Sequence, residues 1–528
     1  MANSNRVGPN PKKKPAEPAT VSKKRERRPV SATSSITSLT VLRNRLQHLT
    51  RWIFIGLGVV LVLGFGLVSV PNMRTETQGT GDVAKVNRKV IEREPFEALV
   101  RQTLDSPYSF MSGPTQELAV RNMLLDQEVD RILKLDAARR ERNKVGRQQL
   151  AERIDQAVES VIQQQKSYYK TEEAFKEKYL KKRMKVKDET ELRQKIRKEI
   201  SPDWVKATRE QILIENLERK IRNQASSLPL DKAKPEEIEY RVRHILIKAE
   251  NRSDAKAKQA AQAILDQLKA GADFVKLAKE KSEDEATKTQ GGDLDWLAKG
   301  GFYQYPELEQ VVLETKPGQF SGPVKTSLGY HIVKVEDRRF SPSKHWENYV
   351  ENLKKKAKIE VKDPVLLAYR QMTAEAKDDA ERKKNREKAI AMFEKALEKV
   401  YAPDTRAAIY YTIGTLYSQD NQTAKAAEAF GQASQARPSP EISMALGDAQ
   451  KKLNKKEAAI ESYKLASDMA SDTSSQQHYF THLMLQSTFT EMGQKELAAK
   501  EKAWIDEFMK QQQSSGGFGF PGGTFTVP

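Results

Sequence analysis

The stretch "RVRHILIKAE" (Arg241–Glu250) places a histidine inside what the pattern predicts to be a β-strand. Side chains alternate along a strand, so His244 shares one face with Val242 and Leu246, while Ile245 points to the other face. A second stretch, "GYHIVKVED" (Gly329–Asp337), repeats the arrangement at His331. Two of only six histidines therefore stand in apolar strand patterns, and they are either structural or catalytic.

The residues around these two strands predict an α+β module over 238–338. The first strand, 239–248, leads to a helix that begins after Ser253, a typical N-cap residue, and a second helix begins near Asp273. A loop with the sequence "SEDEATKTQGGDLDWLAKGG" follows, then a helix around 307–314 and two extended runs, "GPVKT" and "GYHIVKVED".

This module resembles the parvulin family of peptidyl-prolyl isomerases through three motifs: "RVRHILIK", "SEDEATKTQGGDLDW" and "PGQFSGPVKTSLGYHIVKV". The resemblance implies that His244 and His331 lie back to back on adjacent central strands beneath a shallow proline pocket. It also implies catalytic positions at Asp284 and at Thr326, which stands beside the second histidine.

The same resemblance places the substrate pocket at Leu294, Phe302 and Leu308. The segment "GGFYQYPEL" is two residues longer than is usual between the last two positions, so the pocket rim departs from the family pattern. Only Lys248 and Arg252 supply positive charge after the first strand, so no phosphorylated substrate is expected. The family implies no metal, nucleophile or cofactor.

The chemistry fits these residues. Resonance holds a peptide bond planar behind a barrier of about 18–20 kcal/mol, and exchange at Xaa-Pro bonds takes tens to hundreds of seconds. A catalyst needs only to bind the twisted amide better than the planar forms, which an apolar pocket with a polar floor can do. The alternative reading is that each strand histidine is a hydrogen-bonded core residue.

The N-terminal region predicts a membrane segment. Residues 1–51 carry 12 Lys or Arg against 2 Asp or Glu and should be disordered. The next 19 residues, 52–70, have no charge, and as a helix they span about 28 Å. Positive-inside logic then predicts a single-pass inner-membrane protein with a cytoplasmic N-terminus and an extracytoplasmic or periplasmic body. The absence of cysteine agrees with an oxidising compartment, and the thinly spread charge beyond residue 51 does not indicate nucleic acid binding.

Helical periodicity extends through residues 80–230, with amphipathic stretches at 116–142, 148–166, 171–182, 188–199 and 202–225. Its opening, "VAKVNRKVIEREPFEALV", resembles the start of the helical chaperone domain of SurA-like and PpiD-like proteins. The pattern alone does not distinguish a cradle for other polypeptides from a solvated spacer. A connecting helix is expected within 341–362.

Residues 365–510 contain a repeat at tetratricopeptide spacing, an α-solenoid. Gly447, Ala459, Tyr463 and Ala466 recur 33 residues after the equivalent residues Gly414, Ala426, Phe430 and Ala433. Two clear repeats are fewer than a stable array needs, so degenerate repeats are expected at both ends. The groove of such a domain either holds a protein partner or serves as a packing scaffold. Residues 511–528 are expected to form a disordered tail.

His478 and His482 stand four residues apart on a predicted repeat helix, a spacing that could bind a metal. No H-E-x-x-H motif accompanies them, so no metal site is predicted.

The sequence therefore predicts a multi-domain fold class: one transmembrane helix, an all-α chaperone-like domain, an α+β parvulin domain and an α-solenoid. The expected function is a membrane-anchored isomerase and chaperone for unfolded or newly translocated polypeptides with Xaa-Pro bonds. The alternative is a non-catalytic chaperone or assembly scaffold, in which the parvulin module binds peptides and the repeats hold a partner.

Overall fold

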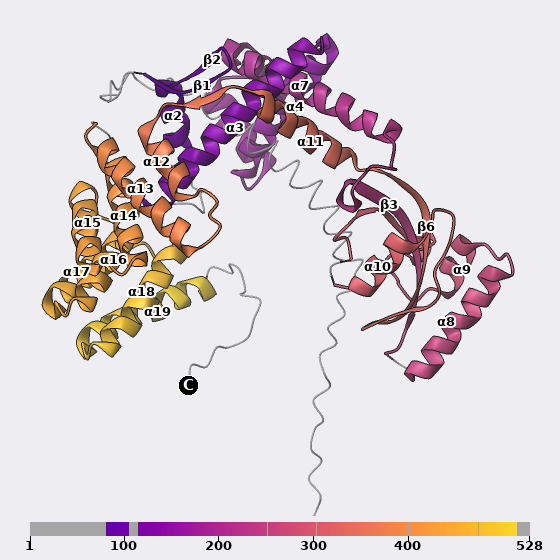
Figure 1. Cartoon of the computed structure of the whole chain (residues 1–528). Helices are drawn as coiled ribbons and strands as arrows, with labels where there is room; N and C mark the ends of the chain where they lie inside the picture. The colour runs from indigo at the N-terminus through magenta and orange to yellow at the C-terminus, as the bar shows by residue number, and fades with distance from the viewer. Residues whose placement is uncertain are drawn as a thin grey trace, which may run out of the picture. The chain divides into compact units, whose positions relative to one another are not determined.

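The computed structural model describes residues 81–104, 114–250, 252–302, 304–399, 402–473 and 475–514 (Figure 1). These residues form two compact units. One is the stretch Tyr240–Arg338, and the other combines the segments before and after it.

The first unit is built on a four-stranded sheet in the order β4-β3-β6-β5. Its strands are β3 (Ile238–Lys248), β4 (Asp293–Ala298), β5 (Val324–Thr326) and β6 (Gly329–Phe340). The strands β5 and β6 are antiparallel, with Val324 opposite His331 and Thr326 opposite Gly329. This register sets Thr326 close to the second histidine.

Two helices cover one face of this sheet, α8 (Asp254–Lys269) and α9 (Phe274–Lys281). Ser253 caps the first turn of α8, as the sequence predicted, and Asp273 caps the first turn of α9. Apolar residues from both helices pack on Ile245 and Ile247 of β3 and on Tyr330 and Ile332 of β6. The remaining elements are the short 3₁₀ helix η4 (Lys288–Gln290) and α10 (Pro306–Glu314).

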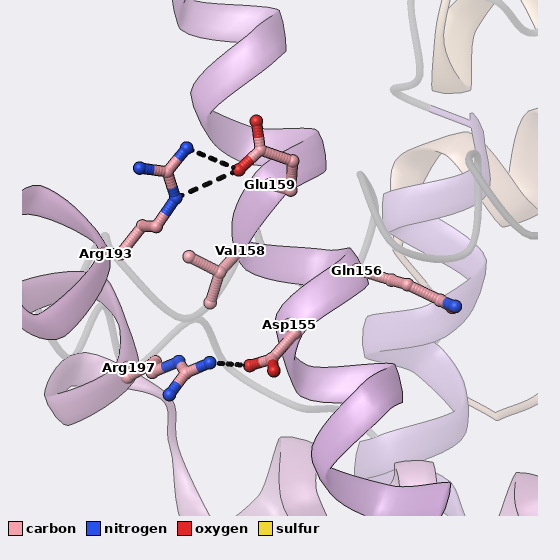
Figure 2. Close-up of a pocket in the computed structure, with 6 residues that line it drawn as sticks. All are labelled: Asp155, Gln156, Val158, Glu159, Arg193 and Arg197. Carbon is pink, nitrogen blue, oxygen red and sulfur yellow. Dashed lines mark hydrogen bonds and ion pairs between the residues drawn. The ribbon is translucent and has the colours of Figure 1, made fainter. Parts of the chain in front are cut away.

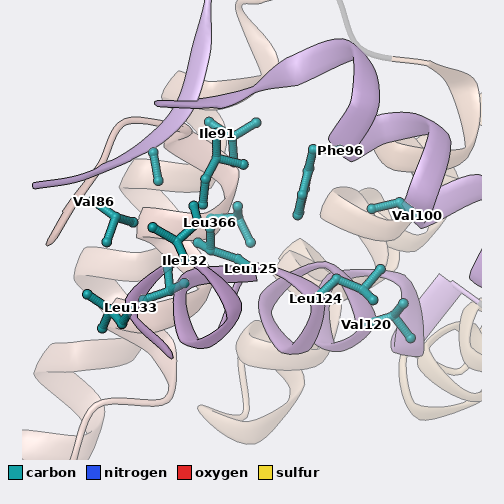
Figure 3. Close-up of a cluster of buried hydrophobic side chains, with 13 residues drawn as sticks. Val86, Ile91, Phe96, Val100, Val120, Leu124, Leu125, Ile132, Leu133 and Leu366 are labelled. Atoms are coloured by element: carbon teal, nitrogen blue, oxygen red, sulfur yellow. The ribbon is translucent and has the colours of Figure 1, made fainter. Parts of the chain in front are cut away.

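The second unit begins with a small sheet in the order β2-β1-β7. Its strands are β1 (Asp82–Val86), β2 (Lys89–Glu92) and β7 (Ile359–Val361). Figure 3 shows the core that joins this sheet to α2 (Arg93–Leu104), α3 (Pro114–Arg140) and Leu366. The first strand and the last therefore come from segments about 270 residues apart, as the bond from the Lys358 amide to the Asn87 side chain also shows.

The helices that follow α3 agree closely with the predicted stretches. They are α4 (Arg147–Ser167), α5 (Glu172–Ala174), the π-helical η1 (Phe175–Met184), α6 (Glu189–Glu199) and α7 (Pro202–Gln224). Local caps explain this agreement, because Asp188 and Ser201 each accept a hydrogen bond from the first turn of the following helix. The short 3₁₀ turns η2 (Ala225–Ser227) and η3 (Pro235–Glu237) lead to β3.

The segment 341–362, expected as a connecting helix, contains α11 (Pro342–Lys356) and then the strand β7. Trp346 and Val350 of α11 pack with α3 and α7 residues in one buried cluster. This segment thus completes the core of the N-terminal helical region.

The C-terminal region contains four consecutive helix pairs. The middle two are the clear repeats, and one further pair lies on each side of them. The pairs are α12 (Pro364–Met372) with α13 (Asp379–Leu397), α14 (Pro403–Gln419) with α15 (Thr423–Ala436), α16 (Pro440–Lys452) with α17 (Lys456–Met469), and α18 (Gln476–Glu491) with α19 (Lys495–Ser514). Gly414 and Gly447 face the rings of Phe430 and Tyr463, where an added Cβ would stand 2.6 Å from ring carbon. The glycine is therefore what lets each pair of helices approach.

A buried polar cluster links α3 to the first clear repeat. Arg121 bonds to Glu117 at 2.9 Å, to Glu97 at 2.8 Å and to Thr405 of α14 at 2.9 Å. Burial opposes the Arg121 charge, but hydrogen bonds and attraction to the two glutamates outweigh it and raise the pKa of Arg121. A charge buried in this way is stable only while its partners stay in place.

One part of the predicted fold class is corrected. Among the helices within the described ranges, none is both long and apolar enough to cross a bilayer. The stretch 52–70, for which the transmembrane helix was predicted, lies outside the described residues, as does the basic segment 1–51. Residues 511–514, predicted as part of a disordered tail, continue α19, and 515–528 lie outside the described residues.

Candidate active site

The sheet of the first unit turns both strand histidines to the same face. Ile245 and Ile247 of β3, and Tyr330 and Ile332 of β6, point toward α8 and α9. Because side chains alternate along a strand, His244 and His331 point to the opposite face. The neighbouring strands β3 and β6 thus place the two rings side by side.

The two imidazoles share a hydrogen bond. His244 Nδ1 lies 3.2 Å from His331 Nδ1, and the rings stack with their centroids 5.4 Å apart at 25°. Both side chains are buried, with 2% of His244 and none of His331 exposed. Their ring nitrogens must therefore be satisfied by protein groups.

Those groups stand at both ends of the histidine pair. Thr326 Oγ1 lies 3.0 Å from His331 Nε2 and accepts a bond from the Leu328 amide at 3.2 Å. At the other end, His244 Nε2 lies 2.9 Å from Asp284 Oδ2 and 3.1 Å from Thr287 Oγ1. A buried chain of polar groups therefore runs from Thr326 to Asp284.

The donors in this chain can all point one way. With Asp284 ionised, His244 donates from Nε2, so its Nδ1 accepts a bond from the Nδ1–H of His331. The Nε2 of His331 then accepts the Thr326 hydroxyl proton. The hydroxyl of Thr287 donates to Asp284. Every ring nitrogen then has a hydrogen-bond partner.

The environment keeps the second ring uncharged. Burial, and next the repulsion from His244, lower the pKa of His331 to about 3, although Asp284 acts in the opposite direction. His331 is therefore neutral at physiological pH. The His331 ring is therefore a polar but uncharged part of the floor.

Local backbone contacts hold this arrangement. Ser282 Oγ accepts from the amides of Leu246 at 3.2 Å and Asp284 at 3.3 Å, so the loop is tied to β3. Gly292 has φ +74°, and an added Cβ would stand 2.0 Å from the His244 carbonyl oxygen. The glycine pair in "QGGD" thus lets β4 approach the histidine strand.

The three predicted pocket residues come from β4 and the α10 region, and all are buried: Leu294 is 4% exposed, Phe302 5% and Leu308 0%. Tyr305, which the sequence reasoning missed, joins them to the histidines. Its ring centroid lies 6.3 Å from that of His331, its amide bonds to the Phe302 carbonyl at 2.7 Å, and its carbonyl accepts from the Leu308 amide. Tyr305 therefore links the backbone around Phe302 and Leu308 to the histidine pair.

Thr287 is the second residue that sequence reasoning missed. It lies three residues after Asp284 and is 5% exposed. A Thr at this spacing from an Asp is a common turn pattern, so only its bond to a buried histidine distinguishes it. The structure thus brings together His244, Asp284, Thr326 and His331 and adds Thr287 and Tyr305, while the catalytic roles stay predictions.

The other histidine pair shows no metal geometry. His482 is buried, with Nδ1 bonded to Glu501 and Nε2 2.7 Å from the Ala470 carbonyl oxygen. His478 Nδ1 accepts from the Asp472 amide at 3.1 Å. Within the described ranges, no group of three or more acidic or histidine side chains could hold a metal ion.

A shallow cavity of about 420 Å³ lies between α4 and α6 of the second unit (Figure 2). Arg193 pairs with Glu159 at 2.8 Å and Arg197 pairs with Asp155, so the charged groups that line it neutralise one another. Such exposed, balanced pairs do not define a ligand.

Comparison with known families agrees with this geometry. Residues 244–337 match the PPIC-type PPIase domain family, residues 39–203 match the SurA-like N-terminal domain, and 407–440 and 440–473 each match a tetratricopeptide repeat.

The related proteins share the isomerase region. The chaperone SurA of Saccharophagus degradans is 47% identical over 100 residues, which cover 19% of this chain and 23% of that protein. SurA of Pseudomonas fluorescens is 42% identical over 106 residues, 20% of this chain and 24% of that protein. The matched region thus spans about a quarter of the length of these curated relatives.

Two solved structures are single domains. A PpiC-type isomerase domain is 31% identical, covering 20% of this chain and 97% of that chain, with a TM-score of 0.19. The parvulin domain of PpiD from E. coli is 36% identical, covering 20% of this chain and 90% of that chain, with a TM-score of 0.16.

The sheet, the paired histidines and the family match define residues 244–337 as a parvulin-type peptidyl-prolyl cis-trans isomerase domain. In this chain the domain stands between a region that matches the SurA-like N-terminal domain family and two C-terminal tetratricopeptide repeats.

Proposed function

We propose that this chain is an extracytoplasmic foldase that binds unfolded or newly translocated polypeptides and speeds isomerisation of their Xaa-Pro bonds. The observation that carries the proposal is the buried hydrogen-bond chain through Thr326, His331, His244 and Asp284. The match of the N-terminal region to a SurA-like domain and the lack of cysteine support a location outside the cytoplasm.

In this proposal the two histidine rings floor the pocket and Leu294, Phe302, Leu308 and Tyr305 form its apolar wall. A proline ring held against that wall fixes one side of the amide while the other side rotates. The twisted amide has lost its resonance, so a site of low polarity disfavours the planar forms more than the twisted one. No covalent step is needed.

Asp284 acts in this scheme as a positioning residue. Its Oδ2 bonds to His244 and receives the Thr287 hydroxyl, so it fixes the tautomer of His244 and, through it, that of His331. Thr326 does the same from the other end. The polarity of the whole chain of bonds therefore depends on one buried carboxylate.

The test compares full-length wild type, His244→Ala and His478→Ala in an isomerisation assay on Xaa-Pro peptides. His478 lies on α18 in the repeat domain, so its substitution controls for loss of an imidazole elsewhere. We expect His244→Ala to lose most of the catalysed rate while His478→Ala keeps it.

A parallel assay measures suppression of aggregation of an unfolded protein. Equal background isomerisation rates in all three variants, with suppression retained, would refute the catalytic proposal. That result would favour the second candidate, a chaperone or scaffold in which the parvulin domain only binds peptides. Its supporting observation is that the three pocket residues leave so little surface exposed.

We also propose that the repeat domain holds a protein partner, because arrays of paired helices present an extended surface for such contacts.

A further inference from the structure

The net positive charge beyond residue 51 is concentrated in one place. Residues 52–528 hold 79 Lys or Arg and 70 Asp or Glu, a net charge of +9. Residues 175–187, which are the π-helical η1 and the three residues after it, hold seven Lys or Arg and a single Glu, a net charge of +6. One short helix of the second unit therefore supplies most of the net charge of this long segment.

The π-helical winding of η1 collects three of these cations on one face. In a π-helix the hydrogen bonds join residues i and i+5, so residues i, i+4 and i+5 lie about one turn apart on the same side. Lys178, Lys182 and Arg183 have this spacing, and all three are exposed. We call them the η1 cation face. In an α-helix of the same sequence, Arg183 would point away from Lys178.

The acidic groups nearest in the sequence are paired with other lysines. Lys176 pairs with Glu172 at 2.9 Å, and Lys181 pairs with Glu177. Within the described ranges, the ion pairs of η1 are formed by these two lysines and not by the η1 cation face. The face thus presents three positive charges to solvent.

Other residues already fill the structural role that such cations often have. Lys and Arg stabilise the end of a helix by bonding to its last carbonyls, but the Met184 carbonyl accepts its bond from Lys195 of α6, at 2.8 Å. Like charges one turn apart repel each other and cost helix stability. On α6, by contrast, Arg193 and Arg197 pair with acidic residues of α4 (Figure 2). An external anion would offset the cost at the η1 cation face.

The apolar side of η1 narrows the kind of anionic partner. Phe175, Tyr179 and Leu180 are buried in the core of this helical region, and the exposed residues of η1 are all charged. A helix that binds a lipid surface inserts apolar side chains between the headgroups, which η1 does not offer. An extended acidic polypeptide needs no such side chains. Its carboxylates two residues apart stand about 7 Å apart on one side, within reach of cations one helical turn apart.

We propose that the η1 cation face binds acidic stretches of extended polypeptides, a step that rests on the proposed function because it names one class among the clients of the foldase. The face lies within residues 39–203, which match the SurA-like N-terminal domain family. Its charges act over about 10 Å at 0.1 M salt, so they speed the encounter with chains that carry closely spaced Asp or Glu.

The test measures binding of a fluorescently labelled peptide in which Glu alternates with Ser, and of the same peptide with Gln in place of Glu. Full-length wild type is compared with the η1 variant, which combines Lys178→Gln, Lys182→Gln and Arg183→Gln. The same proteins are mixed with vesicles of phosphatidylcholine with and without phosphatidylglycerol, because an anionic lipid surface is the other partner that three cations could attract.

The control variant combines Lys144→Gln, Lys206→Gln and Arg209→Gln, which removes the same charge from exposed positions outside η1. At low salt we expect the η1 variant to bind the Glu peptide about tenfold more weakly than wild type, as the loss of three exposed ion pairs implies, and the control variant to lose less than about twofold. Added salt should remove the difference between wild type and the η1 variant, because the contacts are exposed.

Equal losses in the two variants, or equal binding of the Glu and Gln peptides by wild type, would overturn the proposal. An η1 variant that loses binding to phosphatidylglycerol vesicles but keeps its affinity for the Glu peptide would overturn it as well. The isomerisation rate on a short uncharged Xaa-Pro peptide tests the foldase proposal separately, and we expect the η1 variant to keep the wild-type rate. A wild type without this activity would count against the foldase and leave the peptide-binding result standing.

Discussion

The lowered pKa of His331 predicts that the parvulin unit loses stability in mild acid through this one ring. In the unfolded chain a histidine takes up a proton near pH 6.5, whereas in the fold the pKa of His331 is about 3. Below pH 6.5 the unfolded state therefore binds one proton more than the folded state, and stability falls as pH falls. The loss ends below about pH 3, where both states are protonated.

The size of the effect follows from the same two values. Each pH unit within this window costs about 1.4 kcal/mol, so lowering the pH from 7 to 4.5 removes about 2.5 kcal/mol from the free energy of unfolding. His331→Gln keeps polar atoms near Thr326 and His244 but cannot titrate. The acid sensitivity of this variant should therefore be smaller than that of wild type by about 2.5 kcal/mol.

Amide hydrogen exchange resolved to peptides of β3 and β6 measures this difference in the full-length chain, after correction for the intrinsic pH dependence of exchange. His478→Gln is the control, because His478 lies on α18 in the other unit. If wild type and His331→Gln lost the same stability in β3 and β6 between pH 7 and 4.5, the assignment of His331 as a buried neutral ring would be wrong.

Three further changes test other parts of the structure. Thr287→Val removes a buried hydroxyl from the site, so it should cost about 1–2 kcal/mol of stability and lower kcat/KM. The control is Thr289→Val, which changes an exposed residue in the same turn and should leave both quantities unchanged. Gly414→Ala brings a methyl group against the ring of Phe430 and should destabilise the repeat domain by about 1–3 kcal/mol in urea unfolding. The control is Gly431→Ala, whose methyl group meets open space within α15 and should stabilise the domain slightly. Arg121→Met removes the buried cation that Glu97 and Glu117 share and should cost about 3–5 kcal/mol by thermal unfolding; a loss below about 1 kcal/mol would show that the cluster is not holding the repeats.

Much of the secondary structure could be predicted because its determinants are local. Ser201 caps the helix that the sequence placed at 202–225, and Asp273 caps the helix that was expected after it. The two histidines could be placed together because the resemblance to the parvulin family implies that their strands are neighbours. The bond from Thr326 to His331 follows from the pairing of β5 with β6, whereas the bond from His244 to Asp284 depends on the loop after α9.

The missed features depend on contacts between distant segments. Nothing near Ile359 indicates a strand whose partner is Val86, and the segment was therefore expected as helix alone. Tyr305 lies in the stretch that is longer than the family pattern, where a motif gives no position. His482 looked like half of a metal pair because its partner Glu501 comes from the next helix.

The placement of β7 has a consequence for the order in which this chain can fold during translation. The β1 strand leaves the ribosome long before β7 is synthesised, so the N-terminal sheet stays incomplete while the isomerase is being made. Once folded, the isomerase holds its flanks together, because the Ser341 amide bonds to the Glu237 carbonyl at 2.7 Å. The nascent chain then closes a much shorter loop to join its first strand to its last. Folding of the isomerase domain thereby assists the assembly of the rest of the same chain.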